Sequence, residues 1–367
     1  MPTVLKRVLQ VLGAIVVLLV VVVGGYIIYL EATYNRIADD TPINVENNPS
    51  QMLAPATTYK MATYKIGFGA YTPDYTFFMD EGMTKDGKPT VGTHSTAVSR
   101  ESVEACTNGA IETLKALNPD FLLLQEVDTD STRSYNVNQK AAFESAFPAF
   151  SSAFAVNFHS GYLAYPIGDP HGIVNAGLLL MGNAHVDNAT RYSYPIDEDF
   201  PTKFFDLDRC FAVERLPVDN GKELVLINSH MSAYTKDGTL REKQLALLCG
   251  IMEKEAAEGD YVIVGGDWNH ALGDSLELYE SNYRPPNWVS KFDESLLPQG
   301  FSVVRASNIE AVPTCRNNDI PYEKGHTYTV TVDGFVVSDN VKASAQNIDT
   351  GFQFSDHNPV LLTFELQ

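Results

Sequence analysis

The stretch YVIVGGDWN, residues 261–269, decides the fold and shows where its polar residues lie. The apolar run from Tyr261 to Val264 predicts a buried strand, and the chain becomes polar directly after the two glycines that follow. Asp267 and Asn269 therefore stand at the end of a core strand, where the edge of a sheet can organise them. The structural alternative is an Asx turn at Asp267 that only ends the strand.

Other short apolar runs predict further buried strands at residues 61–68, 121–124, 176–181, 224–227, 331–337 and 360–364. Apolar residues recur at helical spacing over 103–117, where Asn118-Pro119 ends the helix, and again from Thr239 to a stop at Gly259. This mixture of strands and helices predicts a layered α/β fold of two packed sheets with helices outside.

Several polar residues lie beside these strands. They are Glu126 after FLLLQ, His230 after LVLINS, Asp333 within TVDGFVV, and the pair Asp356-His357 before the final strand. Charged side chains next to buried strands are costly unless they are paired or bind a metal ion. We therefore expect these residues to converge on one rim of a sheet.

Each of these residues also has a structural explanation when it is taken alone. Glu126 is typical of an exposed strand end, His230 of a hydrogen-bonded structural imidazole, and Asp356-His357 of a cap before Pro359. Together they favour a functional site, because their order and their neighbouring residues match one known pattern.

The segments QEV, NSH, GGDWN, VDGFVVS and SDHNPV resemble the motifs of the endonuclease/exonuclease/phosphatase superfamily, which has the deoxyribonuclease I-like fold. The chain most resembles the membrane-anchored bacterial members. The resemblance implies a four-layered α/β sandwich of two packed mixed sheets flanked by helices. It also implies hydrolysis of a phosphoester bond with a divalent ion, for which Mg²⁺ is expected and Mn²⁺ or Ca²⁺ are alternatives.

The resemblance implies a role for each motif residue. Glu126 would be the main metal ligand and Asp356 an outer ligand or a support for the site, since a hard divalent ion prefers carboxylate oxygen. His357 would accept a proton from the attacking water or bind a phosphate oxygen. Asp333 would orient this imidazole and raise its basicity.

The remaining motif residues are expected to act on the nucleophile and the leaving group. Asp267 would position or deprotonate the water, and Asn269 would donate a hydrogen bond to the phosphoryl oxygen. His230 would protonate or stabilise the leaving oxygen. Arg133 and Tyr135, in STRSYNVNQ, are substrate candidates because family members carry substrate contacts in this region, with a surface loop as the alternative. The aromatic-rich segment 69–80 predicts either a packed loop or a lip that contacts substrate or membrane.

Lys65 departs from the family pattern. The first strand of the family ends in an Asn that helps to hold metal or phosphate, as in TYNIG, whereas this chain reads TYKIG at residues 63–67. Two positive charges about 5 Å apart repel by about 3 kcal/mol at an effective dielectric of roughly 20. We expect weakened metal binding and activity, unless Lys65 turns to solvent or itself binds the phosphate of the substrate.

The N-terminal segment predicts a membrane anchor. The apolar run from Val11 to Leu30 would span roughly 30 Å as a helix, and Lys6-Arg7 precedes it. The positive-inside rule places the N-terminus in the cytoplasm and the rest outside, in a single-pass protein of the cell membrane. A cleaved signal peptide is the alternative. The predicted division is an anchor at 1–30, a polar juxtamembrane tether at 31–58 and one catalytic domain at 59–367.

Composition narrows the choice of partners. With 46 acidic and 26 basic residues, the net charge of −20 disfavours an electrostatic grip on nucleic acid. No basic stripe with interleaved aromatics predicts sequence-specific nucleic-acid binding. The expected substrate carries phosphate, as a lipid head group, a nucleotide or a nucleic acid. We therefore predict a membrane-anchored, extracellular, Mg²⁺-dependent phosphodiesterase or phosphatase; the alternative is a catalytically weakened binding or scaffold protein on the same fold.

Overall fold

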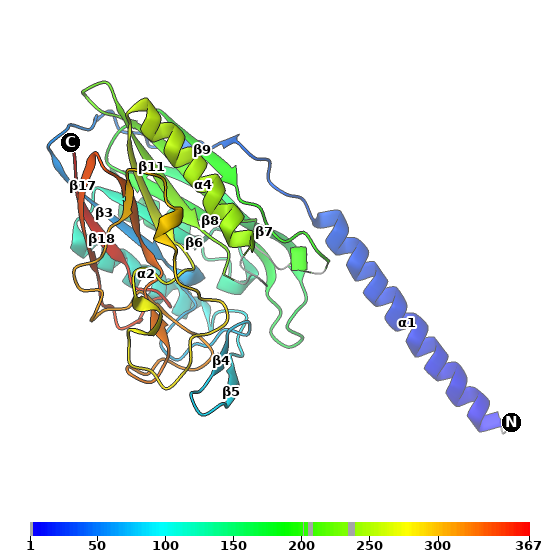
Figure 1. The fold of residues 1–367 in the computed structure, drawn as a ribbon. Helices are drawn as coiled ribbons and strands as arrows, with labels where there is room; N and C mark the ends of the chain where they lie inside the picture. Colours follow the sequence, from blue (N-terminus) through cyan, green and yellow to red (C-terminus); the bar gives the residue numbers. More distant parts are fainter. Residues whose placement is uncertain (1–2, 201, 205–207, 234–238) are drawn as a thin grey trace.

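Two seven-stranded mixed sheets pack face to face in the computed structural model, which describes residues 3–200, 202–204, 208–233 and 239–367 (Figure 1). From edge to edge the first sheet contains β1 (Thr41–Pro42), β9 (Asn188–Ser193), β10 (Cys210–Pro217), β11 (Glu223–His230), β12 (Tyr261–Asp267), β16 (Asp333–Ser338) and β13 (Phe301–Val303). Strands β11 and β12 are parallel and the other neighbours are antiparallel.

The second sheet also combines one parallel pair, β3 and β6, with antiparallel neighbours. From edge to edge it contains β17 (Val341–Asn347), β18 (Val360–Leu366), β3 (Thr58–Lys65), β6 (Phe121–Asp128), β8 (Gly172–Gly182), β7 (Ser151–Leu163) and β2 (Val45–Glu46). Two small two-stranded sheets pair β4 (Glu81–Met83) with β5 (Pro89–Val91) and β14 (Cys315–Arg316) with β15 (Thr329–Val330), within the residues that the structure describes.

The helices cover the outer faces of the two sheets. Helices α2 (Arg100–Leu117) and α3 (Gln139–Ala146) pack Leu114 and Phe143 on the second sheet, and α4 (Thr239–Glu258) packs Leu248 on the first. A third cluster, which includes Phe121 and Ile263, fills the space between the sheets. The layers are therefore helix, sheet, sheet and helix, which confirms the predicted α/β sandwich.

The register of the first sheet brings three predicted site residues side by side. His230 is the pairing partner of Asp267, and Asp267 is the pairing partner of Asp333. In the second sheet Lys65 pairs with Gln125, the residue before Glu126. Strand ends of both sheets therefore deliver polar side chains to one end of the sandwich.

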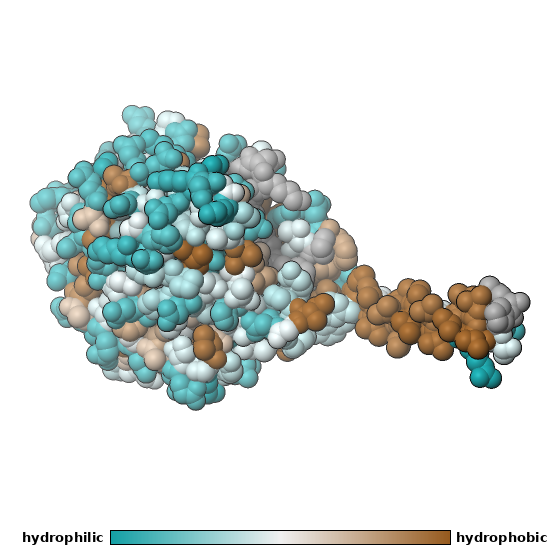
Figure 2. All heavy atoms as spheres, turned by 90° about the horizontal axis from the view of Figure 1, so that it is seen from below, coloured by the Kyte–Doolittle hydropathy of each residue, from teal (hydrophilic) through white to brown (hydrophobic). Residues whose placement is uncertain are grey.

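Helix α1 (Thr3–Thr33) projects from the domain as a rod and is apolar around its surface (Figures 1 and 2). It extends three residues past the predicted anchor at 1–30. Among the described residues, it is the helix that is long and apolar enough to cross a membrane, a property that a signal sequence near an N-terminus shares.

The end of α1 is docked on the domain. The hydroxyls of Tyr26 and Tyr29 each accept a hydrogen bond of 2.8 Å, from the backbone N–H of Ala164 and Tyr162 respectively. Leu30 is buried beside Phe158, in a cluster formed mainly by strands β7 and β8. Helix α1 therefore has a defined contact with the end of β7.

The segment after α1 differs from the expected free tether at 31–58. Strand β1 pairs with β9 and β2 pairs with β7, so the segment extends both sheets. Leu53 is 1% exposed and forms a β-bridge with Val218. The prolines hide this pairing in the sequence, because they interrupt any strand-like periodicity. The segment is therefore a strap that is paired along the domain.

We expect Leu53→Ala to lower the free energy of unfolding by about 2–4 kcal/mol, because it removes a buried side chain that the core cannot replace. The neighbouring Met52 is 44% exposed, so Met52→Ala should change stability by less than about 0.5 kcal/mol. Urea unfolding of the full chain, followed by tryptophan fluorescence, measures both changes. Equal effects of the two substitutions would show that the strap is not bound in solution.

Candidate active site

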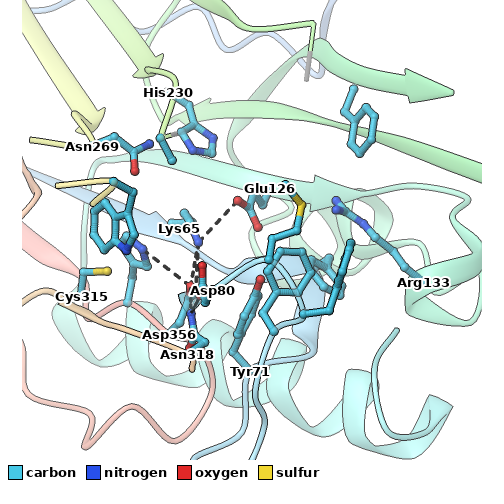
Figure 3. A pocket seen from close by; sticks show the side chains of 18 of the residues that line it. Lys65, Tyr71, Asp80, Glu126, Arg133, His230, Asn269, Cys315, Asn318 and Asp356 are labelled. Atoms are coloured by element: carbon cyan, nitrogen blue, oxygen red, sulfur yellow. Dashed lines mark hydrogen bonds and ion pairs between the residues drawn. The ribbon is translucent and has the colours of Figure 1, made fainter. Parts of the chain in front are cut away.

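A pocket with a cavity of about 180 Å³ lies at the strand ends that carry the motif residues (Figure 3). The predicted site residues that line it are Lys65, Glu126, Arg133, His230, Asn269, Asp356 and His357. Its apolar lining includes Phe68, Phe77, Phe78, Phe158, Leu163 and Trp288. Charged groups and an aromatic wall therefore meet in one cavity.

His357 and Asp333 form a tightly hydrogen-bonded pair beside the pocket. The distance from His357 Nδ1 to Asp333 Oδ2 is 2.7 Å, and both side chains are buried. Burial alone would lower the pKa of His357, but the Asp333 carboxylate outweighs it and raises this pKa well above its ordinary value. His357 is thus an imidazolium held by Asp333, with Nε2 directed to Asp267 and Asp356 at 3.9 Å from each.

Asp267 lies between the two imidazoles. Its Oδ2 is 3.4 Å from His230 Nε2 and has no hydrogen-bond partner within the described part of the chain. Its other oxygen, Oδ1, accepts from the backbone N–H of Asn269 at 2.9 Å. Burial raises the pKa of Asp267 to about 6, with the positive His357 opposing this rise and Asp333 adding to it. The carboxylate is therefore mostly ionised at neutral pH, yet close enough to titration to accept a proton.

His230 is held neutral. Burial, followed by the positive charges of Arg209, Lys65 and His357, lowers the pKa of His230 well below its ordinary value. A neutral imidazole has one N–H donor and one acceptor nitrogen. This arrangement supports a hydrogen bond to a leaving oxygen better than transfer of a proton from an imidazolium.

Glu126 is aimed into the pocket by a break in strand β6. The pairing of β6 with β8 shifts register between Leu124 and Val127, and Glu126 has φ +53°. A bulge of this kind places two residues opposite one and re-aims a side chain. Gln125 turns inward and donates to Asn228 Oδ1 at 2.7 Å, which leaves Glu126 to face the pocket.

Lys65 stands between the two predicted metal ligands (Figure 3). Its Nζ is 3.0 Å from Asp356 Oδ2 and 3.4 Å from Glu126 Oε1. Burial lowers the pKa of Lys65, but Asp356 and Glu126 outweigh burial and raise it above its ordinary value. Lys65 therefore does not turn to solvent, which was one of the expected alternatives, and it remains charged.

The predicted metal ligands do not fit a divalent ion in this arrangement. Members of the family generally use such ions, and the site is rich in carboxylates. Asp356, however, also accepts hydrogen bonds from Ser355 and Asn318, besides those from Lys65. An ion shared by Glu126 and Asp356 would have to displace a buried ammonium. The metal-ligand roles expected of these two residues are thus not supported by their contacts.

Besides Glu126 and Asp356, a second group of possible metal-ligand atoms lies nearby. One oxygen or nitrogen atom each from Asp267, Asp333 and His357 lies within 4.8 Å of the others. Metal ligands must be deprotonated, and His357 is held as an imidazolium by Asp333. In this arrangement the carboxylates of Asp267 and Asp333 therefore neutralise the His357 imidazolium and do not bind a metal ion.

Asn269 is positioned by its own backbone and by a neighbouring loop. It has φ +49°, and its amide nitrogen donates to the carbonyl of Met231 at 2.7 Å. Arg241 donates to the Asn269 carbonyl at 3.1 Å. One N–H of the Asn269 amide is thus committed to the protein and the other remains for a ligand in the pocket.

The two substrate candidates differ in position. Arg133 lines the pocket, where Asp128 binds it through two hydrogen bonds of 3.1 and 2.8 Å and its guanidinium lies 4.1 Å from the ring centroid of Phe68. Tyr135 is 41% exposed, lies outside the pocket lining, and its hydroxyl donates to the carbonyl of Val98. Only Arg133 of this pair is therefore brought to the described pocket.

Further polar residues reach the pocket without a motif to mark them. Asn318 bridges Asp80 and Asp356 with distances of 2.9 and 3.2 Å from its amide nitrogen. Arg316 also lines the pocket, and its guanidinium donates to the carbonyl of Thr72 at 2.8 Å. Asp80 ends the aromatic-rich segment 69–80, which the structure both packs and exposes to the pocket. Loops far apart in sequence supply these residues, so only the clustering of aromatic residues before Asp80 gave a signal.

The two packed sheets carry buried carboxylates and imidazoles at their strand ends. This arrangement is the one expected for the deoxyribonuclease I-like fold that the motifs indicated. The chain belongs to the Endonuclease/Exonuclease/phosphatase family, whose family model matches residues 98–357. No curated protein matches the chain.

Solved structures resemble the chain over most of its length. An endonuclease/exonuclease/phosphatase from Beutenbergia cavernae is 13% identical with a TM-score of 0.55, covering 84% of this chain and 72% of that one. TDP2 from D. rerio, complexed with single-strand DNA product, is 14% identical with a TM-score of 0.53 and coverages of 84% and 99%. ANGEL2, a 2′,3′-cyclic phosphatase, is 14% identical with a TM-score of 0.52 and coverages of 88% and 98%. At these identities the likeness shows the fold alone.

Asp333→Asn is expected to lower the pKa of His357, because burial is then no longer outweighed by the Asp333 carboxylate. Nitrogen NMR of the histidine rings follows this titration directly. The raised pKa of wild type stabilises the fold below about pH 6.5, and this contribution is lost as pH rises through the folded pKa. The free energy of unfolding should therefore fall with pH above about 6.5 more steeply in wild type than in Asp333→Asn.

The matched control is Asp187→Asn, which removes the carboxylate beside the half-exposed His185 and leaves the pocket untouched. Its His357 should titrate as in wild type. An unchanged titration of His357 in Asp333→Asn would contradict the assigned pair.

Proposed function

We propose that the chain hydrolyses a phosphoester bond in this pocket. The proposal is carried by Asp267 Oδ2, a buried carboxylate oxygen that lies between His230 and the His357 imidazolium without a hydrogen-bond partner in the described part of the chain. Such an oxygen is an acceptor for the O–H of a water molecule that attacks phosphorus. Membership of a family that includes phosphoesterases and nucleases supports this reaction class.

Each residue has a defined part in the reaction. The water oxygen forms a bond to phosphorus as the bond to the leaving oxygen breaks, and Asp267 takes the proton of the water. The His357 imidazolium donates a hydrogen bond to a phosphoryl oxygen as negative charge increases there. His230 and the free N–H of Asn269 stabilise the leaving oxygen and the phosphoryl group. The leaving oxygen takes up a proton from solvent as Asp267 releases its own, so Asp267 is regenerated and the products are an alcohol and a phosphate that carries one additional hydroxyl.

The size of the cavity favours a small phosphoester with an apolar part. A cavity of about 150 Å³ holds benzene, so one of about 180 Å³ takes the phosphoryl group and only the part of the substrate next to it. The Phe77, Phe78 and Phe158 side chains also line the pocket and offer apolar contacts to the substrate. A duplex would remain outside such a cavity.

The position of α1 supports a substrate at a membrane surface. Phe158 and Leu163 line the pocket and also belong to the cluster that buries Leu30 at the end of α1. Tyr165 and Ile167, just beyond β7, are 55% and 91% exposed. We therefore propose a single-pass anchor with the domain outside the cell, and a lipid head group in preference to nucleic acid.

We expect His357→Ala to lower kcat/KM for bis-p-nitrophenyl phosphate by about 10²–10³-fold, because loss of one fixed hydrogen-bond donor to a developing negative charge costs about that much. His185→Ala removes a half-exposed imidazole outside the pocket and should leave the rate unchanged. Retained hydrolysis in His357→Ala would contradict the assigned role. A folded wild-type chain that hydrolyses neither this ester, nor DNA, nor sphingomyelin in vesicles would instead favour the binding or scaffold function.

The anchor has its own test. In cells that express the full chain, we expect the protein to resist alkaline extraction from the membrane, to retain residues 1–30 by mass spectrometry, and to be degraded by protease added outside the cells. Loss of the apolar segment from the mature protein would show a cleaved signal peptide. Protection of the domain from external protease would reverse the proposed orientation.

A further inference from the structure

We infer that the Lys65 ammonium takes the place of a divalent ion in this chain, and that no such ion binds between Glu126 and Asp356. The starting observation is geometric. Lys65 Nζ lies 3.0 and 3.2 Å from the two oxygens of Asp356 and 3.4 Å from Glu126 Oε1. One cation from the chain itself therefore joins the two carboxylates that an ion would join.

Strand geometry directs Lys65 to this position. Tyr64 and Ile66, its neighbours on either side, are buried in the cluster beneath α2 and α3. Successive side chains of a strand point to opposite faces, so Lys65 points to the pocket side. Its carbonyl also accepts a hydrogen bond of 2.6 Å from Ser355 Oγ. Placing the Lys65 side chain on the other face of the sheet would require the strand to shift by one residue and expose its apolar neighbours.

The surroundings of the ammonium make the position stable. Lys65 is 6% exposed, and its Nζ lies 5.3 Å from the ring centroid of Tyr71. Asp356 in turn is held by Ser355 and Asn318, so neither of its oxygens is left free for another cation. An incoming ion would have to break this network and remain beside a buried positive charge.

The charge balance points in the same direction. Glu126 and Asp356 contribute two negative charges, of which Lys65 neutralises one. With a neutral residue at position 65 the same two carboxylates would carry the full charge that attracts a divalent ion. The identity of residue 65 thus decides whether the site holds an ammonium or an external ion.

The ammonium can also act on the substrate, a consequence that rests on the proposed function. Lys65 has three N–H donors; two bond the oxygens of Asp356, and Glu126 Oε1 lies 3.4 Å from the same nitrogen. Lys65 lines the cavity, so a phosphoryl oxygen can take the place of Glu126 beside the third donor. The chain would then neutralise phosphate charge with its own side chain.

Mn²⁺ binding to the full chain in a non-ionic detergent, measured by electron paramagnetic resonance, tests the inference without any turnover. We expect Lys65→Asn and Lys65→Met to bind Mn²⁺ about 100-fold more tightly than wild type. Lys65→Arg keeps the charge and should bind as weakly as wild type. Lys88→Asn, the same charge change at an exposed turn, should also resemble wild type.

The gain must depend on the carboxylates, so Glu126→Gln in the Lys65→Asn background should abolish it. Wild type that binds Mn²⁺ as tightly as Lys65→Asn, with loss on Glu126→Gln, would overturn the inference. Thermal unfolding of each variant confirms that it is folded, and Lys65→Met, which keeps most of the stem, provides a second variant if Lys65→Asn unfolds.

Hydrolysis in the presence of EDTA separates this inference from the proposed function. A wild-type rate on bis-p-nitrophenyl phosphate that EDTA leaves unchanged, together with inhibition of Lys65→Asn by EDTA, would support both. Abolition of the wild-type rate by EDTA would overturn the inference and leave the hydrolase function standing. Absence of any hydrolysis together with the predicted Mn²⁺ pattern would reject the function and support the inference.

Discussion

Burial of carboxylates at one end of the sandwich is the constraint on which the pocket depends. Glu126, Asp267, Asp333 and Asp356 lie in or directly behind the cavity, and burying an unpaired charge costs about several kcal/mol per ion. Lys65 compensates Glu126 and Asp356, and the His357 imidazolium compensates Asp333. Among the described residues, Asp267 has no hydrogen-bonded cation, and burial raises its pKa to about 6. The group proposed to accept the proton is thus a buried carboxylate without a directly bonded counter-ion in that part of the chain.

The same constraint explains why loops far apart in sequence converge here. Asn318 ties Asp80 to Asp356, and Ser355 ties Asp356 to the end of β3. These contacts satisfy lone pairs that would otherwise be buried without donors. The loops are therefore ordered by the charges of the strand ends as much as by their own apolar residues.

Much of the fold and most of the motif residues were predictable from the sequence. Residues 121–124, 224–227 and 261–264 are continuous apolar runs because both faces of those strands are covered, which makes them easy to recognise. Strand β7 was missed because polar residues such as Asn157 and His159 interrupt its apolar pattern. The strap at 34–58 was missed because two-residue strands have no periodicity to detect.

The directions of the side chains limited how much of the site could be predicted from the sequence. Glu126 and Lys65 were both marked by the motifs, yet their contact depends on a bulge in β6 and on the alternation of β3. Tyr135 and Arg133 stand two residues apart, and only the latter lines the pocket. Asp80 precedes β4 and Asn318 follows the two-residue strand β14, so nothing in their spacing indicates that they meet. A sequence can indicate which residues lie near a site. The contacts between their atoms depend on the folded backbone.

The hydrogen bonds that Tyr26 and Tyr29 form with the end of β7 have a consequence for how substrate is found. A domain on a flexible tether would rotate freely and would encounter its substrate from bulk solution. With α1 in a bilayer, as proposed, the docked domain would keep a fixed tilt and height above the lipids. Its encounters would then be governed by lateral diffusion in two dimensions, and surface density rather than bulk concentration would set its working rate.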